Sequence, residues 1–181
     1  GITFDRHPRE VLQSDYQPQM LTTLNTKLRL LRETGVGRVE VLHFTRELAA
    51  LSAREFMTQV LKERLGVTTL VIGYDHRFGH NRAEGFDDYV RYGKELGIEV
   101  VQNSELTMHI SSSNACSFAE KLGKHVSSSA IRRLLKEGDV SRANLFLDRP
   151  YTITGCVTHG FAEGRKMGFP TANLDTTGYP L

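Results

Sequence analysis

The chain has 181 residues, of which 39% are hydrophobic and 24% charged, and its formal net charge is +2. This composition is ordinary for a soluble globular protein, and no apolar run approaches the roughly 20 residues needed to span a bilayer. A net charge so close to zero argues against a general nucleic-acid coat, so we expect neither nucleic acid nor membrane among the partners.

The first four residues read like the end of a β-strand. The chain begins with Gly1 rather than Met and shows no signal peptide, so we expect further residues upstream. Asp5, Arg6 and His7 follow directly and would lie at one edge of a sheet. A plain turn before the next element explains these residues equally well.

A helix is predicted over residues 21–35, because its leucines recur at helical spacing and Gly35 gives a C-terminal stop. Thr22 or Thr23 is its expected N-cap. Residues 38–44 are rich in strand formers and predict a β-strand.

A second helix is predicted to begin at Ser52 and to end at Gly66. Ser52 and Glu55 have the spacing of a capping box, in which each side chain satisfies a free backbone N–H of the other. Residues 68–72 are short and apolar, as a buried parallel strand would be. The residues expected to face inward from this helix are Phe56, Val60 and Leu61.

A further helix over 86–96, ended by Gly97, and a strand over 98–102 complete the alternation. Strands and helices at this spacing predict an α/β fold with a parallel sheet and helices on its faces. Such sheets bind ligands beyond the carboxyl ends of their strands, which here means the residues after 44, 72 and 102.

The rest of the chain divides at about residues 148–150. Residues 103–126 are polar and are expected to form an irregular insertion or a hairpin. Two short helices follow over 129–137 and 139–147. Residues 151–158 then alternate with a period of two, so we expect a domain boundary just before them.

The loop from Gly73 to Arg82 is the first candidate binding segment, because it follows the 68–72 strand. The Asp75 carboxylate could accept a hydrogen bond from a ribose or an amine. Arg77 or Arg82 could contact phosphate. An aromatic side chain, Tyr74 or Phe78, would pack against a flat ring. A plain polar surface loop is an equal alternative.

Three serines, Ser127 to Ser129, precede an amphipathic helix and form the second candidate. Helix N-termini bind anions through their free N–H groups, and serine hydroxyls add donors. Arg132 or Arg133, one turn into the helix, would contact the same anion. Taken alone, a simple serine N-cap is the better explanation.

The third candidate runs from Gly155 to Gly160 and from Gly164 to Leu174. Glycines allow a backbone to approach a bulky ligand such as a polyphosphate, and Arg165 adds positive charge. Thr171 and Asn173 supply neutral oxygens that suit Mg²⁺. A phosphate-binding P-loop is not expected, because the Gly-Lys-Ser/Thr ending is missing and no helix is predicted to follow Lys166.

Cysteine and histidine patterns predict no other metal chemistry. Cys116 and Cys156 fit neither a zinc pattern nor a disulfide framework, so we expect unpaired thiols in a reducing cytosol. The seven histidines contain no His-Glu-x-x-His pair. The run from His76 to His80 has one residue too many for a His-x-Gly-His motif and follows the wrong strand.

In this order, the segments resemble the bacterial bifunctional riboflavin kinase/FAD synthetase family. The resemblance covers nearly the whole chain, and its last motif is the most specific. The matching pieces are Thr3-Phe-Asp-Arg-His-Pro-Arg-Glu-Val-Leu12, Leu21-Thr-Thr-Leu24, Phe44 to Ser52, Gly73 to Arg82, Ser127-Ser-Ser-Ala-Ile-Arg132, and Gly164 to Asn173-Leu.

The resemblance implies a Rossmann-like, doubly wound adenylyltransferase domain over 1–148, which would transfer AMP from MgATP to FMN and release FAD and pyrophosphate. It implies that 149–181 begin a β-barrel kinase domain that makes FMN from riboflavin and ATP. The family's His-x-Gly-His motif and first strand would lie upstream of this chain, and its catalytic glutamate downstream. We therefore expect residues 1–181 alone to complete neither reaction.

The resemblance also implies which residues bind substrates. His76 stands where the family often has Phe. The residues expected to bind ATP or flavin in the adenylyltransferase are Asp5, His7, Gly73, Asp75, Arg77, Phe78, Gly79, Ser128, Ser129 and Arg132. Those expected in the kinase are Gly160, Gly164 and Arg165, with Thr171 and Asn173 as ligands of Mg²⁺.

Two alternatives stay open at this point. One is a non-catalytic module that binds nucleotide or flavin in a regulatory role. The other is a different adenylyltransferase of the same superfamily, acting on nicotinamide or pantetheine nucleotides. The segment from Gly164 to Leu174 counts against the second, because those enzymes have no such appended barrel.

Overall fold

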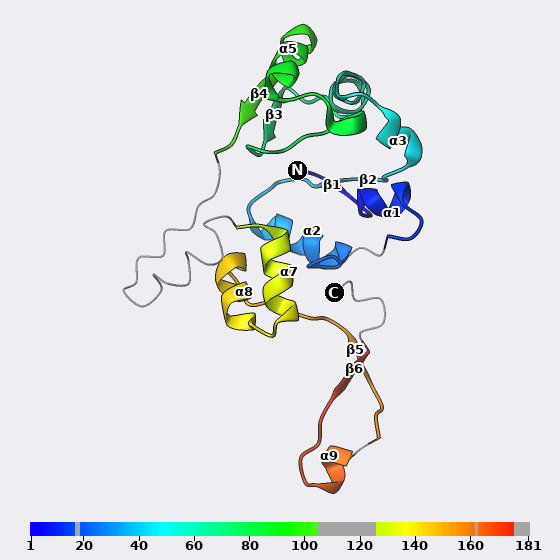
Figure 1. Ribbon diagram of the computed structural model, residues 1–181, viewed down its shortest axis with the longest axis vertical. Coiled ribbons are helices and arrows are strands. Elements are labelled where there is room, and N and C mark those ends of the chain that lie inside the picture. The colour runs from blue at the N-terminus through cyan, green and yellow to red at the C-terminus, as the bar shows by residue number, and fades with distance from the viewer. Residues whose placement is uncertain (17–18, 105–125, 162, 176–181) are drawn as a thin grey trace, which may run out of the picture. The chain divides into compact units, whose positions relative to one another are not determined.

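The computed structural model describes residues 1–16, 19–104, 126–161 and 163–175. It divides into two compact units, each of which is described by itself (Figure 1). The first unit comprises Gly1–Pro18 and Gly35–His109, and the second comprises Gln19–Thr34 and Ile110–Leu181. The residues predicted as an insertion or hairpin, 103–126, lie mostly outside the described part of the chain.

The first unit contains two pairs of parallel strands. The strand predicted at the N-terminus is confirmed and pairs with the second strand, with Ile2 opposite Glu40. The third and fourth strands pair with Thr69 opposite Glu99. The elements of this unit are β1 (Ile2–Phe4), α1 (Pro8–Leu12), β2 (Glu40–Leu42), α3 (Arg46–Ala50), α4 (Ala53–Glu55), η1 (Phe56–Arg64), β3 (Thr69–Ile72), η2 (His80–Arg82), α5 (Phe86–Leu96) and β4 (Glu99–Gln102).

The core of the first unit forms where α4, η1 and α5 pack on β3 and β4. Tyr89 and Met57 are its largest fully buried side chains. The described residues of this unit cover one face of β3, because Val71 is 63% exposed while Ile72 is buried. The expectation of a strand buried on both faces is therefore wrong. The buried members of this core are Ala53, Met57, Leu61, Ile72, Tyr89 and Ile98.

Local signals in the sequence set several boundaries correctly. Thr23 caps its helix by accepting from the Thr26 N–H group. The capping box of Ser52 and Glu55 is present, although the helix it opens continues as a π-helix over Phe56–Arg64. Phe56 packs against the core as predicted but is only half-buried.

The second unit is built around two antiparallel helices and a separate strand pair. Ile131, Leu134 and Ala143 form its buried core. A two-stranded antiparallel ribbon, with Thr158 opposite Asn173, carries a short helix at its tip (Figure 1). The elements are α2 (Leu24–Glu33), α7 (Ser128–Lys136), α8 (Val140–Leu147), β5 (Cys156–Thr158), α9 (Glu163–Lys166) and β6 (Asn173–Asp175).

One expectation for the C-terminal segment needs correction. The strand predicted over 151–158 is limited to β5, because only these three residues have a partner strand among the described residues. The short helix α9 was not predicted, but it ends at Lys166, and in the described residues beyond it no helix follows, as expected. An exposed ion pair joins Lys166 of this helix to Glu163 at 2.7 Å.

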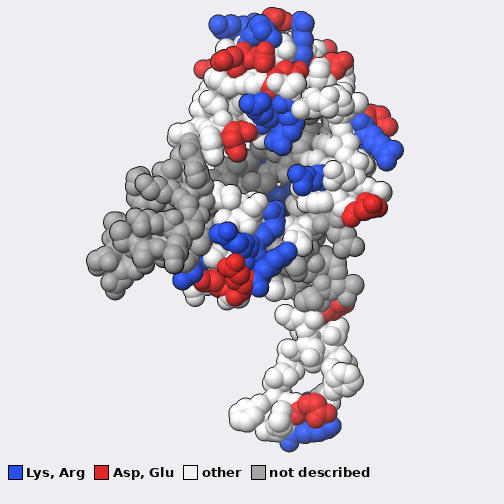
Figure 2. Space-filling model, in the orientation of Figure 1, with Lys and Arg blue, Asp and Glu red and all other residues white. Residues whose placement is uncertain are grey.

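Charged side chains of both signs are interspersed on the face shown in Figure 2, in keeping with the small net charge. In the described part of the chain, no helix is both long enough and apolar enough to cross a membrane.

Candidate functional site

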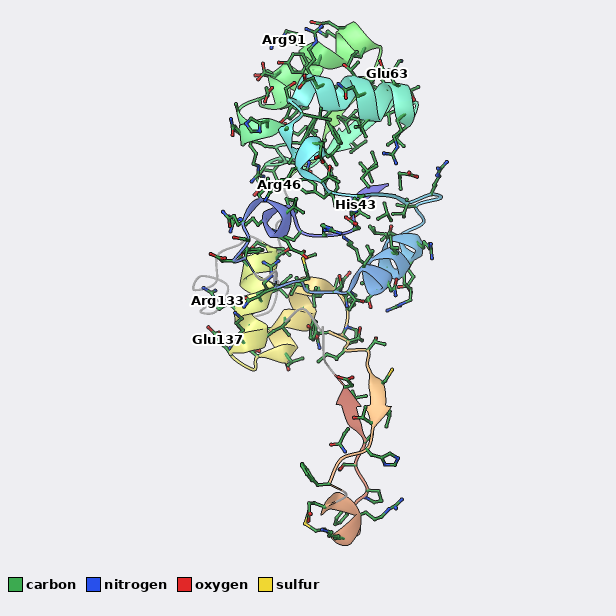
Figure 3. The ribbon with its side chains drawn as sticks, turned by 90° about the vertical axis from the view of Figure 1, so that its right-hand side faces the viewer. His43, Arg46, Glu63, Arg91, Arg133 and Glu137 are labelled. Carbon is green, nitrogen blue, oxygen red and sulfur yellow. The ribbon has the colours of Figure 1, made fainter. Side chains whose placement is uncertain are left out.

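Asp5 joins the carboxyl ends of β1 and β2. Its carboxylate lies 2.5 Å from the His43 ring and accepts from the Phe44 N–H group at 3.0 Å. His43 is visible at this position in Figure 3. The sequence predicted Asp5 at a sheet edge, but it placed His43 inside a strand over 38–44. The strand ends at Leu42, so His43 instead belongs to the edge.

Asp5 is held as a carboxylate by its neighbours. Burial acts to raise its pKa, but the Phe44 N–H group, the His43 ring and the Arg6 charge together lower the pKa below its ordinary value. Asp5 is therefore negatively charged near neutral pH. In the described structure this charge ties two strand ends together, and its use toward a ligand stays a prediction.

His7 has a structural position at the start of α1. Its Nδ1 atom accepts from the Arg9 N–H group at 3.1 Å, which makes it the N-cap. Its ring lies 5.1 Å from the Tyr16 ring. These contacts support a turn before the next element, and ligand binding by His7 stays a prediction.

The loop after β3 is docked onto the segment between α3 and α4. The His80 N–H group donates to the Leu51 carbonyl oxygen at 2.7 Å. Gly79 has φ of 90° and packs so closely that an added Cβ would lie 2.5 Å from the Ala53 backbone nitrogen. Only glycine fits this position, both for its dihedral angle and for its close packing. Gly73 begins a turn that the His76 N–H group closes.

Phe78 lies between aromatic rings of two helical segments. It stacks on Tyr89 with 4.2 Å between ring centroids and 15° between planes, and the Phe56 ring lies 5.5 Å away. Asp75 and Arg77, on the same loop, are exposed to solvent and can meet a ligand. The sequence singled out Phe78 but not Tyr89, whose only signal was its place in the helix predicted over 86–96.

The His76 ring is predicted to make folding stability dependent on pH. Desolvation and the charge of Arg82 lower the pKa of His76 below 6.5, and Asp75 opposes this only in part. The folded state therefore binds the proton less readily than the unfolded state. Stability should fall as the pH drops below about 6.5 and level off below the folded pKa.

The measurement is urea unfolding at about pH 7.5 and about pH 5.5. His76→Phe should reduce the difference between the two midpoints, by a modest amount because the residue is exposed. The same exchange at the exposed His159 is the control. An unchanged pH difference in His76→Phe would contradict the assignment.

One serine of the motif caps a helix, and the other two keep free hydrogen-bond donors. Ser127 is the N-cap of α7 and accepts from the Ala130 N–H group at 3.2 Å. Ser128 and Ser129 occupy the exposed first turn, where their hydroxyls and N–H groups are open to an anion. A simple cap and an anion site are therefore compatible, because Ser127 is the cap while Ser128 and Ser129 face solvent.

Arg132 is fixed by the segment that precedes α2. Its Nε atom donates to the Gln19 carbonyl oxygen at 2.5 Å, and Lys136 donates to the side-chain oxygen of the same residue at 2.7 Å. The hydrogen bond from Arg132 uses its Nε atom and leaves the two terminal nitrogens of its guanidinium as donors. The neighbouring Arg133 is exposed on α7 (Figure 3).

The β5–β6 ribbon brings together the two halves of the C-terminal motif. An added Cβ on Gly160 would overlap the side-chain amide of Asn173. One on Gly164 would overlap the Phe169 carbonyl oxygen and lie 3.1 Å from the Thr171 hydroxyl. Each glycine thus lies against one of the two predicted oxygen ligands, a contact the sequence did not show. Arg165 is exposed on α9.

The oxygen chemistry of this ribbon suits a hard cation. Thr171 and Asn173 offer two neutral oxygens, and Mg²⁺ typically takes few protein ligands and the rest from water and substrate phosphates. Among the described residues, no group of three or more His, Cys, Asp or Glu side chains is gathered to hold a metal. Cys156 is exposed with a free thiol, and Cys116 lies outside the described residues.

The predicted site residues thus fall in both compact units. Those from Asp5 to Gly79 lie in the first, and those from Ser128 to Asn173 lie in the second. Within the units, the structure brings Phe78 onto Tyr89, and Gly160 and Gly164 onto Asn173 and Thr171.

Comparisons with known proteins match both parts of the chain. A family model for FAD synthetase matches residues 1–115, and one for riboflavin kinase matches residues 147–180. A bifunctional riboflavin kinase/FMN adenylyltransferase from Escherichia coli K12 is 36% identical over 173 residues, covering 96% of this chain and 51% of its own length. One from Bacillus subtilis 168 is 35% identical over 177 residues, covering 96% and 50%.

A solved structure is also similar. A protein described as a macrolide-efflux protein from Streptococcus pneumoniae superposes with a TM-score of 0.79 at 29% identity, over 96% of this chain and 52% of that one. The chain therefore spans about half the length of the curated relatives and of the solved structure that it matches.

Proposed function

Because this chain belongs to the FAD synthetase family, we propose that the full-length protein transfers AMP from MgATP to FMN and also phosphorylates riboflavin. Residues 1–148 would belong to a doubly wound adenylyltransferase domain, and 149–181 would begin a β-barrel kinase domain. The observation that carries the proposal is the contact of Gly160 and Gly164 with Asn173 and Thr171. It favours a kinase motif joined to the adenylyltransferase over an adenylyltransferase alone.

In the adenylyl transfer, a phosphate oxygen of FMN would attack the α-phosphorus of ATP, and pyrophosphate would leave. The exposed first turn of α7, with Ser128 and Ser129, would bind ATP phosphates together with Arg132. Phe78 would pack against the flat ring system of FMN. This chemistry needs positioning and charge neutralisation more than covalent catalysis.

In the kinase reaction, a riboflavin hydroxyl would attack the γ-phosphorus of ATP, with ADP as the leaving group. Thr171 and Asn173 would hold Mg²⁺, which when bound neutralises negative charge on the phosphate oxygens. Gly160 and Gly164, which lack a Cβ, leave room for these two side chains at their backbone.

The test is product analysis with the full-length protein. FMN with MgATP should give FAD and pyrophosphate in equal amounts, and riboflavin with MgATP should give FMN and ADP. Binding of FMN and ATP without turnover would instead support the regulatory module. Turnover of nicotinamide mononucleotide or phosphopantetheine in preference to FMN would support a different adenylyltransferase.

A further inference from the structure

The hydroxyl of Tyr89 ties together both ends of a loop segment in the first unit. Tyr89 belongs to α5 and is completely buried. Its hydroxyl accepts from the Phe78 N–H group at 3.1 Å and donates to the Glu84 carbonyl oxygen at 3.0 Å. The Phe78 carbonyl oxygen, at 3.3 Å, is a second acceptor within its reach. One side chain therefore fixes the backbone of the loop at residues 78 and 84.

The ring of Tyr89 fixes the Phe78 side chain as well. The two rings are stacked with centroids 4.2 Å apart, and Phe56 approaches the Phe78 ring at 5.5 Å. Because one face of the Phe78 ring is covered by Tyr89, the orientation of that ring is set by a residue inside the core. Phe78 itself stays only half-buried.

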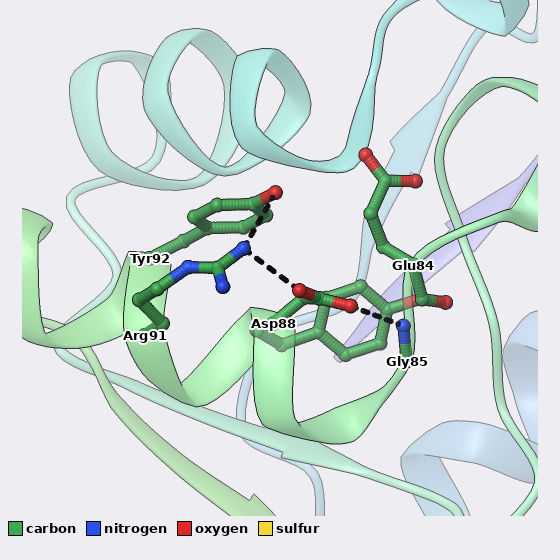
Figure 4. Close-up of polar contacts among 6 residues, drawn as sticks. Glu84, Gly85, Asp88, Arg91 and Tyr92 are labelled. Carbon is green, nitrogen blue, oxygen red and sulfur yellow. Dashed lines mark hydrogen bonds and ion pairs between the residues drawn. The ribbon is translucent and has the colours of Figure 1, made fainter.

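The helix that carries Tyr89 is itself anchored at its start. The Asp88 carboxylate accepts from the Gly85 N–H group at 3.1 Å and from Arg91 at 2.7 Å (Figure 4). On the other side of the loop, Gly79 packs against Ala53. Phe78 is thus flanked by Tyr89 on one side and by the packed Gly79 on the other.

We propose that Tyr89 is a positioning residue for the flavin in adenylyl transfer, acting through Phe78. The proposal rests on the function proposed above, in which Phe78 packs against the FMN ring. If the Phe78 ring is already ordered before FMN binds, less conformational entropy is lost on binding. Loss of the Tyr89 hydroxyl should therefore weaken FMN binding more than ATP binding.

The test uses Tyr89→Phe in the full-length protein, which removes the hydroxyl and keeps the stacked ring. The variant loses the hydrogen bonds to residues 78 and 84, and we expect KM for FMN to rise by about threefold to tenfold as part of that loss reaches the flavin. KM for ATP and the riboflavin kinase rate should change less than about twofold. Equal increases in KM for FMN and for ATP would overturn the proposal, since they would indicate a general structural role.

The matched control is Tyr92→Phe, which removes a hydroxyl from the same helix. The Tyr92 hydroxyl accepts from Arg91 at 3.4 Å, a contact drawn in Figure 4. KM for FMN in this variant should equal that of the wild type. If both tyrosine variants raise it equally, the effect belongs to the helix and not to Tyr89.

A double variant separates this proposal from the proposed function. Phe78→Leu should raise KM for FMN, and adding Tyr89→Phe should raise it no further, because Tyr89 acts through Phe78. Additive effects would overturn the role of Tyr89 while leaving Phe78 as a flavin contact. A wild-type protein that makes no FAD, or an unaffected Phe78→Leu, would instead overturn the proposed function of the loop.

Hydrogen exchange in the wild-type protein gives a measurement that needs no variant. The Phe78 amide donates to a buried hydroxyl, so it should exchange slowly, while the exposed Arg77 and Asp75 amides exchange fast. Fast exchange at Phe78 would show that the loop is not held by Tyr89 and would overturn the proposal.

Discussion

Asn173→Ala should reduce riboflavin phosphorylation by the full-length protein by about 100-fold, because it removes an oxygen ligand from a site that offers few. FAD synthesis from FMN should change less than about twofold, since its proposed phosphate contacts lie on α7. The Mg²⁺ concentration that gives half the maximal kinase rate should rise as well. The measurement is each rate, followed separately over a range of Mg²⁺ concentrations.

Two further variants test whether the oxygen of Asn173 or only its bulk is needed. Asn173→Asp keeps an oxygen at the same position and should retain more kinase activity than Asn173→Ala. Gly160→Ala leaves both oxygen ligands intact, but its added Cβ would displace the Asn173 amide, so it should lower the kinase rate in the same direction. Equal loss of kinase and FAD synthesis in Asn173→Ala would contradict separate sites.

The parts of the fold that the sequence predicted correctly are those governed by short-range signals. Thr23 caps the N–H group of a residue three positions later, and Ser52 and Glu55 cap each other over the same spacing. Residue spacing alone therefore reveals both N-caps. Gly97 likewise ends α5 where the helical pattern stops. The four-residue helix α9 was missed, because Gly164 lies inside it and glycine is a poor helix former.

The candidate site was predicted by residue type but not by contact. Phe78, Thr171 and Asn173 stood out because their side chains have the chemistry of ligand binding. Their supports did not, since Tyr89 lies 11 residues from Phe78, and Gly160 meets Asn173 only when β5 pairs with β6. Such contacts depend on tertiary packing, which residue spacing does not encode.

The end of β2 shows how a small boundary error hides a site residue. Extending that strand to Phe44 placed His43 within a pleat, where alternate side chains face opposite sides. The strand ends at Leu42, and His43 turns instead toward Asp5, 38 residues earlier in the chain. A parallel pair brings such distant residues together at one edge, so the error removed a contact that the topology would otherwise have predicted.

Arg132→Ala should lower kcat/KM for ATP in FAD synthesis by about 100-fold, the usual effect of removing one charged donor from a developing phosphate charge. Riboflavin phosphorylation should stay within about twofold of the wild type. The side chain also donates to the Gln19 carbonyl oxygen, so a small loss of stability, about 1 kcal/mol, is expected. Rates must therefore be compared at a temperature where thermal unfolding shows both proteins folded.

The neighbouring arginine makes a matched control. Arg133→Ala removes the same charge from the same helix, from a residue exposed on α7, and should change FAD synthesis far less. Arg132→Lys keeps the charge but loses the planar fork of donors, so it should restore only part of the rate. If the alanine variants at 132 and 133 are equally impaired, general electrostatic attraction explains the effect. If only Arg132→Ala is impaired and lysine restores part of its rate, the guanidinium held by Gln19 binds the ATP phosphates directly.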